Sequence, residues 1–249
     1  MTLAGWIHLL LFGIVVPIAV IRSKVRVDAG DPLPPLRGHL TATMITLLIF
    51  GAVSVIVAWL EGIPLFPRRS PSGAAWMAGA AFVGVTVVAM RPRWRRAVVE
   101  RQRIVALFAP RDAGERRLWI SASILAGLSE EITWRGVQFS LLGSLTGDPL
   151  VAAVLSAVMF GAAHLVQGHR TAWVIVGYAL AAQALVWLAG SLYVAMAVHA
   201  TYDAIAGLTY GRFATSLGYF DDDTRVPAPA PLTATAFPPA EAADPESRS

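Results

Sequence analysis

The sequence predicts an all-α fold, a polytopic membrane helical bundle with about seven transmembrane helices and a cytoplasmic amphipathic segment. Hydrophobic residues make up 56% of the 249 residues and charged residues only 14%, whereas soluble domains contain about 25% charged residues. Apolar runs of helical length recur along the chain and are separated by short loops. The basic residues gather in alternate loops, which is typical of a membrane protein with a defined orientation. The chain has no cysteine, which excludes disulfides, thiolate metal sites and a cysteine nucleophile.

The N-terminal part, residues 1–90, contains three predicted membrane spans, at 3–21, 40–60 and 73–90. No basic side chain precedes the first apolar run, so we expect a retained helix with an outward N-terminus rather than a signal peptide. His8 in that run is expected to be a satisfied buried polar residue.

Residues 91–117 form a basic segment with nine arginines and interspersed apolar side chains. A basic amphipathic helix lying on the anionic cytoplasmic leaflet accounts for this pattern. Because the arginines lie beside apolar spans, their placement indicates membrane orientation rather than nucleic-acid binding, and we expect no nucleic-acid partner.

Residues 118–213 form the predicted catalytic core, with spans at 118–142, 150–166, 172–188 and 192–208. The tail 214–249 is rich in Pro and Ala and is expected to be disordered. Basic residues number four, nine and one in the first, third and fifth loops, but two, none and none in the others. This distribution predicts a multi-pass protein of the bacterial inner membrane with a cytoplasmic C-terminus.

The span 118–142 carries Glu130, Glu131 and Arg135 within an otherwise apolar run. Glu130 lies roughly 18 Å from the start of the span at about 1.5 Å per residue, close to the middle of a hydrocarbon core about 30 Å thick. An ionisable group there costs at least ~2.5 kcal/mol, so the pattern predicts a functional site that faces the protein interior. His164 and His199 lie in later spans.

Helical spacing divides these groups. Glu131 and Arg135 are four residues apart and can pair, and His199 shares a face with Asp203. Glu130 projects about 100° away from Glu131 and is left free, which makes it a candidate general base. Each group alone has a structural explanation, as a satisfied histidine or a buried ion pair. Their concentration in the last four spans predicts one site.

The polar residues form three motifs. Residues 130–136 read EEITWRG, Phe160-x-x-x-His164 follows, and His199 precedes Asp203 by four positions. In this order the motifs resemble those of the CPBP family, the CAAX-protease and bacteriocin-processing intramembrane proteases. The resemblance covers about residues 118–207.

The resemblance implies an intramembrane endopeptidase that hydrolyses peptide bonds of peptide or membrane-anchored substrates within the bilayer. It implies that Glu130 and His164 activate a water, while His199 and Asp203 support the oxyanion. The family often has Asn at the last position, so Asp203 is alternatively expected to orient His199. No cofactor is expected to be required. The alternative is zinc held by Glu130, His164 and His199, but the HExxH pattern is absent.

Two other functions remain open at the level of the sequence. Glu and His side chains inside spans also occur in proton-coupled transporters, although no internal repeat supports one here. A catalytically silent membrane scaffold would be expected to have lost one of the six site groups, and all six are present.

Overall fold

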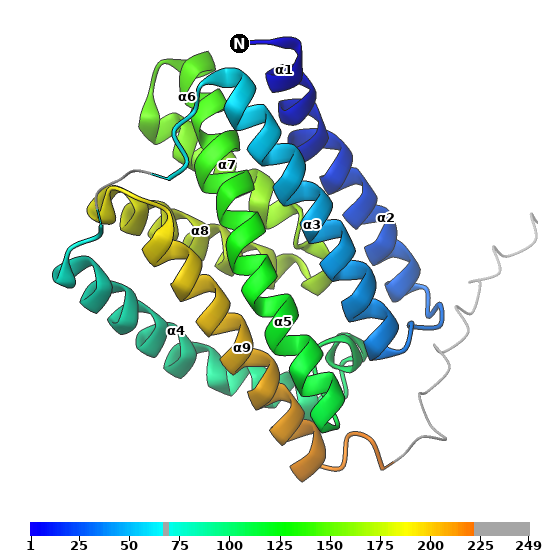
Figure 1. Ribbon diagram of the computed structural model, residues 1–249. Coiled ribbons are helices and arrows are strands. Elements are labelled where there is room, and N and C mark those ends of the chain that lie inside the picture. Colours follow the sequence, from blue (N-terminus) through cyan, green and yellow to red (C-terminus); the bar gives the residue numbers. More distant parts are fainter. Residues whose placement is uncertain (67–69, 222–249) are drawn as a thin grey trace, which may run out of the picture.

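The computed structural model describes residues 1–66 and 70–221. The loop arginines at 68 and 69, and residues 222–249 of the predicted disordered tail, lie outside the described residues. Within the described residues the structure is helical and contains no strand (Figure 1).

The helices follow one another with short connections. Their bounds are α1 Leu3–Leu10, η1 Leu11–Val15, α2 Val16–Asp28, α3 Leu36–Glu61, α4 Gly73–Val99, η2 Arg103–Leu107, α5 Ala113–Glu130, η3 Glu131–Gln138, α6 Phe139–Thr146, α7 Pro149–Ala162, η4 Leu165–Gln167, α8 His169–Ala189 and α9 Tyr193–Ser216. Of these, η1 and η3 are π-helical, and η2 and η4 are 3-10 helices.

The predicted helical membrane bundle is confirmed. Four helical rods in the described part of the chain are long and apolar enough to cross a membrane, namely Leu3–Asp28, Leu36–Glu61, Gly73–Val99 and His169–Ala189. The other three predicted spans correspond to the continuous rod α5–η3–α6, which carries the charged motif, to the shorter apolar helix α7, and to α9.

The helix starts follow the local sequence. Ser72, Asp112 and Asp148 each precede a helix, and their side-chain oxygens accept hydrogen bonds from backbone N–H groups of the first turn. Such N-caps satisfy donors that have no partner within the helix. They explain why α4, α5 and α7 begin where they do.

The basic segment 91–117 differs from the single amphipathic helix that the sequence predicted. Its first part continues α4 to Val99, η2 follows, and α5 already begins at Ala113. Its apolar side chains Trp94, Val98 and Val105 are buried. Val98 and Val105 pack in one cluster with Ala214 of α9, so they face protein rather than lipid.

The start of the predicted disordered tail is also different in the structure. Helix α9 continues to Ser216, and Tyr219 and Phe220 pack against the same cluster as Ala214. The ordered bundle therefore extends to Asp221, beyond the predicted boundary.

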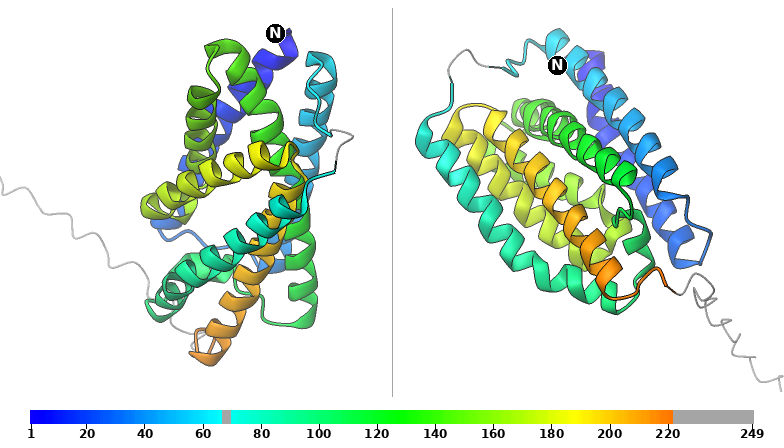
Figure 2. Two further views of the ribbon diagram at one scale, coloured as in Figure 1. Left: turned by 90° about the vertical axis from the view of Figure 1, so that its left-hand side faces the viewer. Right: turned by 60° about the horizontal axis from the view of Figure 1, so that its bottom comes forward.

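The rod α5–η3–α6 occupies the middle of the bundle, between α3 and α9 (Figure 1). A Cβ on Gly127 would lie 2.7 Å from the Met196 carbonyl oxygen and 2.8 Å from the Ala200 nitrogen. The backbones of α5 and α9 therefore touch one turn before the charged motif. This contact sets the distance between Glu131 on the rod and His199 on α9. On its other side α9 lies along α4 (Figure 2).

Candidate active site

The charged motif lies in a π-helix, η3, from Glu131 onward, rather than in the uniform α-helix that the sequence predicted, and Glu130 is the last residue of α5. All eight residues of η3 are buried. π-Helical turns, whose backbone hydrogen bonds join residues five apart, are uncommon and are frequent at functional sites. The structure thus combines an unusual backbone with buried charge at the same place.

Glu131 is fully buried and has two partners. Its Oε1 lies 3.2 Å from Nη1 of Arg135 and accepts a 2.8 Å hydrogen bond from Nδ1 of His199. The predicted Glu131–Arg135 pair is therefore present, and the structure adds the contact with His199. Because Nδ1 of His199 is used in this way, its Nε2 is directed elsewhere.

The Nε2 atom of His199 faces two further carboxylates. It lies 3.7 Å from Oε2 of Glu130 and 3.4 Å from Oδ2 of Asp203. The backbone of Asp203 is fixed in turn, because its carbonyl oxygen accepts a 2.8 Å hydrogen bond from the indole N–H of Trp119. His199 is consequently surrounded by three carboxyl groups from two helices.

Glu130 projects toward both histidines. Its Oε2 lies 3.9 Å from Nε2 of His164 and 3.7 Å from Nε2 of His199. Both distances exceed a direct hydrogen bond. Among the described residues this buried oxygen has no hydrogen-bond partner. Glu130 is thus the member of the motif whose carboxylate is left available.

His164 lies just beyond the end of α7, not inside the span predicted at 150–166. Helix α7 ends at Ala162, and Nδ1 of His164 contacts the Phe160 carbonyl oxygen at 2.8 Å. The carbonyl can only accept, so Nδ1 carries the proton and Nε2 faces Glu130. The chain then turns into α8 through Gly168, whose φ of +98° favours glycine.

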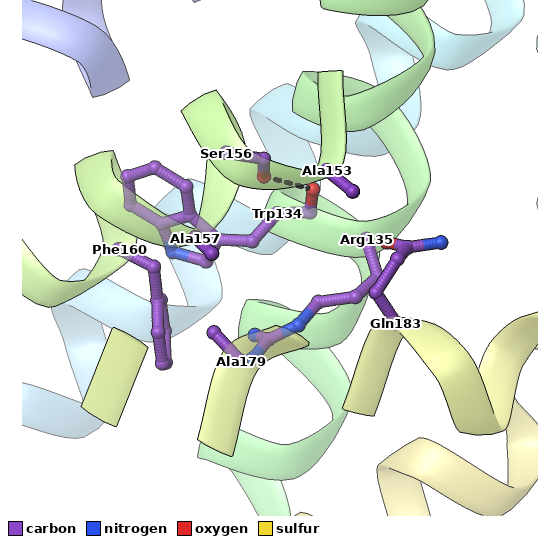
Figure 3. Close-up of a pocket in the computed structure, with 8 residues that line it drawn as sticks. All are labelled: Trp134, Arg135, Ala153, Ser156, Ala157, Phe160, Ala179 and Gln183. Carbon is purple, nitrogen blue, oxygen red and sulfur yellow. Dashed lines mark hydrogen bonds between the residues drawn. The ribbon is translucent and has the colours of Figure 1, made fainter. Parts of the chain in front are cut away.

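Arg135 contacts the same Glu131 oxygen as His199 and also packs against an aromatic ring. Its guanidinium carbon lies 4.3 Å from the centre of the Phe160 ring. Figure 3 shows its side chain reaching from η3 toward Ala179 of α8. The small pocket drawn there is lined by Arg135, Phe160, Gln183 and neighbouring residues, is too narrow for a water molecule, and includes none of Glu130, His164 and His199.

Tyr178 is a neighbour of the site that the sequence did not indicate. Its ring centre on α8 lies 6.1 Å from that of His199, and its buried hydroxyl has no partner among the described residues. No motif contains it, and a tyrosine in an apolar helix is an unremarkable pattern. Only the packing of α8 against α9 places it here.

The alternative of a zinc ion concerns Glu130, His164 and His199. In the ranges 1–66 and 70–221, no group of three or more His, Asp or Glu side chains is arranged to hold a metal ion. As placed, Glu130, His164 and His199 are therefore not arranged as a metal-ligand set.

Part of the chain matches a known protein family. Residues 114–205 match the family described as Type II CAAX prenyl endopeptidase Rce1-like. The predicted resemblance is confirmed over this segment, which contains the six site residues. The match supports a CAAX-type intramembrane endopeptidase as the general class, in a multi-pass membrane protein. No curated protein and no solved structure matches the chain significantly.

Proposed function

We propose that this protein is an intramembrane endopeptidase in which Glu130 and His164 activate a water molecule. The observation that carries the proposal is the unpartnered Oε2 of Glu130, which lies 3.9 and 3.7 Å from two histidine Nε2 atoms. At separations above 3.5 Å a water molecule can bridge two polar atoms. A water in contact with Oε2 and Nε2 of His164 would have both a base and a hydrogen-bond partner.

The chemistry follows from those contacts. Glu130 takes a proton from the water as its oxygen attacks the peptide carbonyl carbon. The carbonyl π electrons move to oxygen, which gives a tetrahedral oxyanion. When the C–N bond breaks, the proton on Glu130 passes to the leaving amine, and His164 assists this transfer from its Nε2 side.

His199 is proposed to stabilise the oxyanion. A doubly protonated His199 would donate through Nδ1 to Glu131 at 2.8 Å and present Nε2–H toward the reacting centre. The carboxylates of Glu131 and Asp203 lie 2.8 Å and 3.4 Å from the two ring nitrogens. Glu131, neutralised in turn by Arg135, is then a positioning residue for His199, and such fixed donors act strongly in a site that excludes water.

The substrate is proposed to be a peptide or membrane-anchored protein that reaches the site within the bilayer. The basic ends of the bundle suggest the orientation. The end of α4 and the starts of α3 and α5 gather at the lower end in Figure 1, where arginines are abundant. By the distribution of basic residues this end is proposed to be cytoplasmic, with the C-terminus on the same side, in a bacterial inner membrane.

A comparison of protein termini in membranes tests the activity. Membranes from cells expressing the wild type, Glu130→Gln and Glu100→Gln would be analysed for new N- and C-termini. Glu100 is an exposed carboxylate that lies 3.9 Å from Arg96 and accepts a 2.9 Å hydrogen bond from Gln102, far from any histidine, so its Gln variant is the matched control. We expect a set of termini that is present with wild type and Glu100→Gln and absent with Glu130→Gln. Identical termini in all three would refute the proposal.

Treatment of the purified protein with a strong chelator separates the glutamate mechanism from the zinc alternative. Because Glu130 and His164 act on water directly in the proposal, cleavage should continue at its original rate. Activity that is lost on chelation and restored only by zinc would instead assign Glu130, His164 and His199 as metal ligands.

A further inference from the structure

A second polar cluster is buried in the bundle, away from the proposed catalytic residues. Its members are His8 of α1, Ser54 of α3, and Thr133 and Gln138 of η3, each at most 1% exposed. We call these four residues the His8 cluster. His8 and Ser54 lie outside the segment that matches the endopeptidase family.

The hydrogen bonds of the His8 cluster run in one direction. Nδ1 of His8 donates to Oε1 of Gln138 at 3.0 Å, which leaves Nε2 to accept from Ser54 at 3.0 Å. Ser54 in turn accepts from the hydroxyl of Thr133 at 2.9 Å. A neutral imidazole satisfies the whole chain, as a buried polar network requires.

The chain begins and ends on η3, at two residues five positions apart. In an α-helix, at 100° per residue, Thr133 and Gln138 would project about 140° apart. In a π-helix residues five apart project much closer to one direction, because the backbone bonds join the same positions. The π-helical winding therefore brings both residues within reach of the chain through Ser54 and His8.

The same eight residues carry two of the site residues. Glu131 and Arg135 lie on η3, on either side of Thr133, and the direction in which they project depends on the winding of the segment. Ser156 of α7 adds a further tie, since its hydroxyl donates to the Trp134 carbonyl oxygen at 2.9 Å (Figure 3).

We propose that the His8 cluster holds η3 in its π-helical winding and so positions Glu131 and Arg135 against His199. His8 and Ser54 are positioning residues supplied by the N-terminal helices. The proposal rests on the proposed endopeptidase function for its effect on activity. Its effect on η3 itself is independent of that function.

Two substitutions of Thr133 test this assignment. Thr133→Val keeps the side-chain shape and removes the hydroxyl, whereas Thr133→Ser keeps the hydroxyl. Thr86→Val is the matched control, because the Thr86 hydroxyl donates only to the Phe82 carbonyl of its own helix. Cleavage of a substrate found by the comparison of termini, and amide hydrogen exchange of η3 and α7, would be measured for each.

For Thr133→Val we expect kcat to fall by about 10-fold or more with KM within about 2-fold, since small displacements of reacting groups cost up to about 100-fold in rate. Amides of η3 should exchange faster while those of α7 are unchanged. Thr133→Ser and Thr86→Val should behave as the wild type in both measurements.

Wild-type kcat and η3 exchange in folded Thr133→Val would overturn the proposal. Faster exchange in all helices alike, with no rescue by Thr133→Ser, would also overturn it, because that pattern describes general stability. If Thr133→Val does not fold, Ser54→Ala interrupts the same hydrogen-bonded chain from α3. The same results are expected for it, and the same results would overturn the proposal. A Glu130→Gln variant that still cleaves would refute the proposed function alone, since the exchange result judges the His8 cluster separately.

Discussion

Two polar clusters of the described residues lie inside this apolar bundle, and they differ in charge and in how fully their hydrogen-bonding groups are paired. The His8 cluster is formally neutral, and its side chains are joined in an unbroken hydrogen-bonded chain. The cluster around His199 contains three carboxylates, and oxygens of Glu130 and Glu131 have no hydrogen-bond partner among the described residues. Both clusters share η3.

The difference indicates two roles: the fully paired cluster stabilises the structure, and the incompletely paired cluster provides groups for the reaction. Buried polar groups that lack partners are costly, so an arrangement that keeps them needs compensation elsewhere. Here the compensation lies next to them: the saturated cluster and the Arg135 ion pair support the same helical segment. Unsatisfied acceptors such as Oε2 of Glu130 are then available to a water and a substrate.

The largest effect on stability is expected from Arg135→Ala. It would leave Glu131 buried with no cation on its own helix, at a cost of about 3 kcal/mol or more. The yield of folded protein and its thermal midpoint in detergent should both fall sharply. Arg96→Ala is the matched control, because Arg96 is 78% exposed and lies 3.9 Å from Glu100, and exposed pairs contribute little. Equal midpoints for the two variants would contradict the structural role of the buried pair.

A smaller effect is expected from Ser54→Ala in the neutral cluster. The substitution leaves the His8 ring without a donor at Nε2 and the Thr133 hydroxyl without its acceptor, at about 1–3 kcal/mol. The midpoint should fall less than for Arg135→Ala. Ser123→Ala, in which the lost hydroxyl had bonded only within its own helix, should change it least. A Ser54→Ala midpoint equal to that of the wild type would show that the chain contributes nothing to stability.

The smallest effect is expected at the exposed edge of the bundle, from Asp112→Asn. The backbone N–H of Glu115, and secondarily Arg37, hold the pKa of Asp112 below its ordinary value. A lowered folded-state pKa stabilises the fold above the unfolded pKa of about 3.9, and this contribution is lost as the pH falls through the folded value. The difference in thermal midpoint between wild type and Asp112→Asn should therefore shrink on acidification below about pH 4. A difference that grows on acidification would contradict the shift.

Much of the fold could be predicted from the sequence because apolar runs report membrane helices directly. The position of each rod follows from 3–21, 40–60, 73–90 and the later runs, although the helices extend past these limits at several ends. The surface helix over 91–117 was not found, because periodicity cannot tell whether an apolar face meets lipid or another helix. Trp94 and Val98 meet protein.

The sequence predicted that Glu130, His164 and His199 belong to one site, and they lie close together, but individual contacts could be predicted only where the partners are close in sequence. The Glu131–Arg135 pair follows from a spacing of four. The contact between Glu131 and His199 joins residues 68 positions apart, and the contact between His8 and Gln138 joins residues 130 apart. No local pattern encodes such pairs. The π-helical winding of η3 likewise depends on partners from other helices, so a reading of the sequence alone returns an α-helix.

The central claim is that Glu130 activates the water that cleaves the substrate, and the most direct test is the cleavage rate of Glu130→Gln in proteoliposomes. The substrate would be one identified from the comparison of termini, and folding would be checked by the thermal midpoint. Because a general base contributes about 10²–10⁴-fold, we expect the rate to fall by about 1,000-fold while the midpoint stays close to that of the wild type. A folded Glu130→Gln protein that cleaves at a rate near that of the wild type would contradict the account.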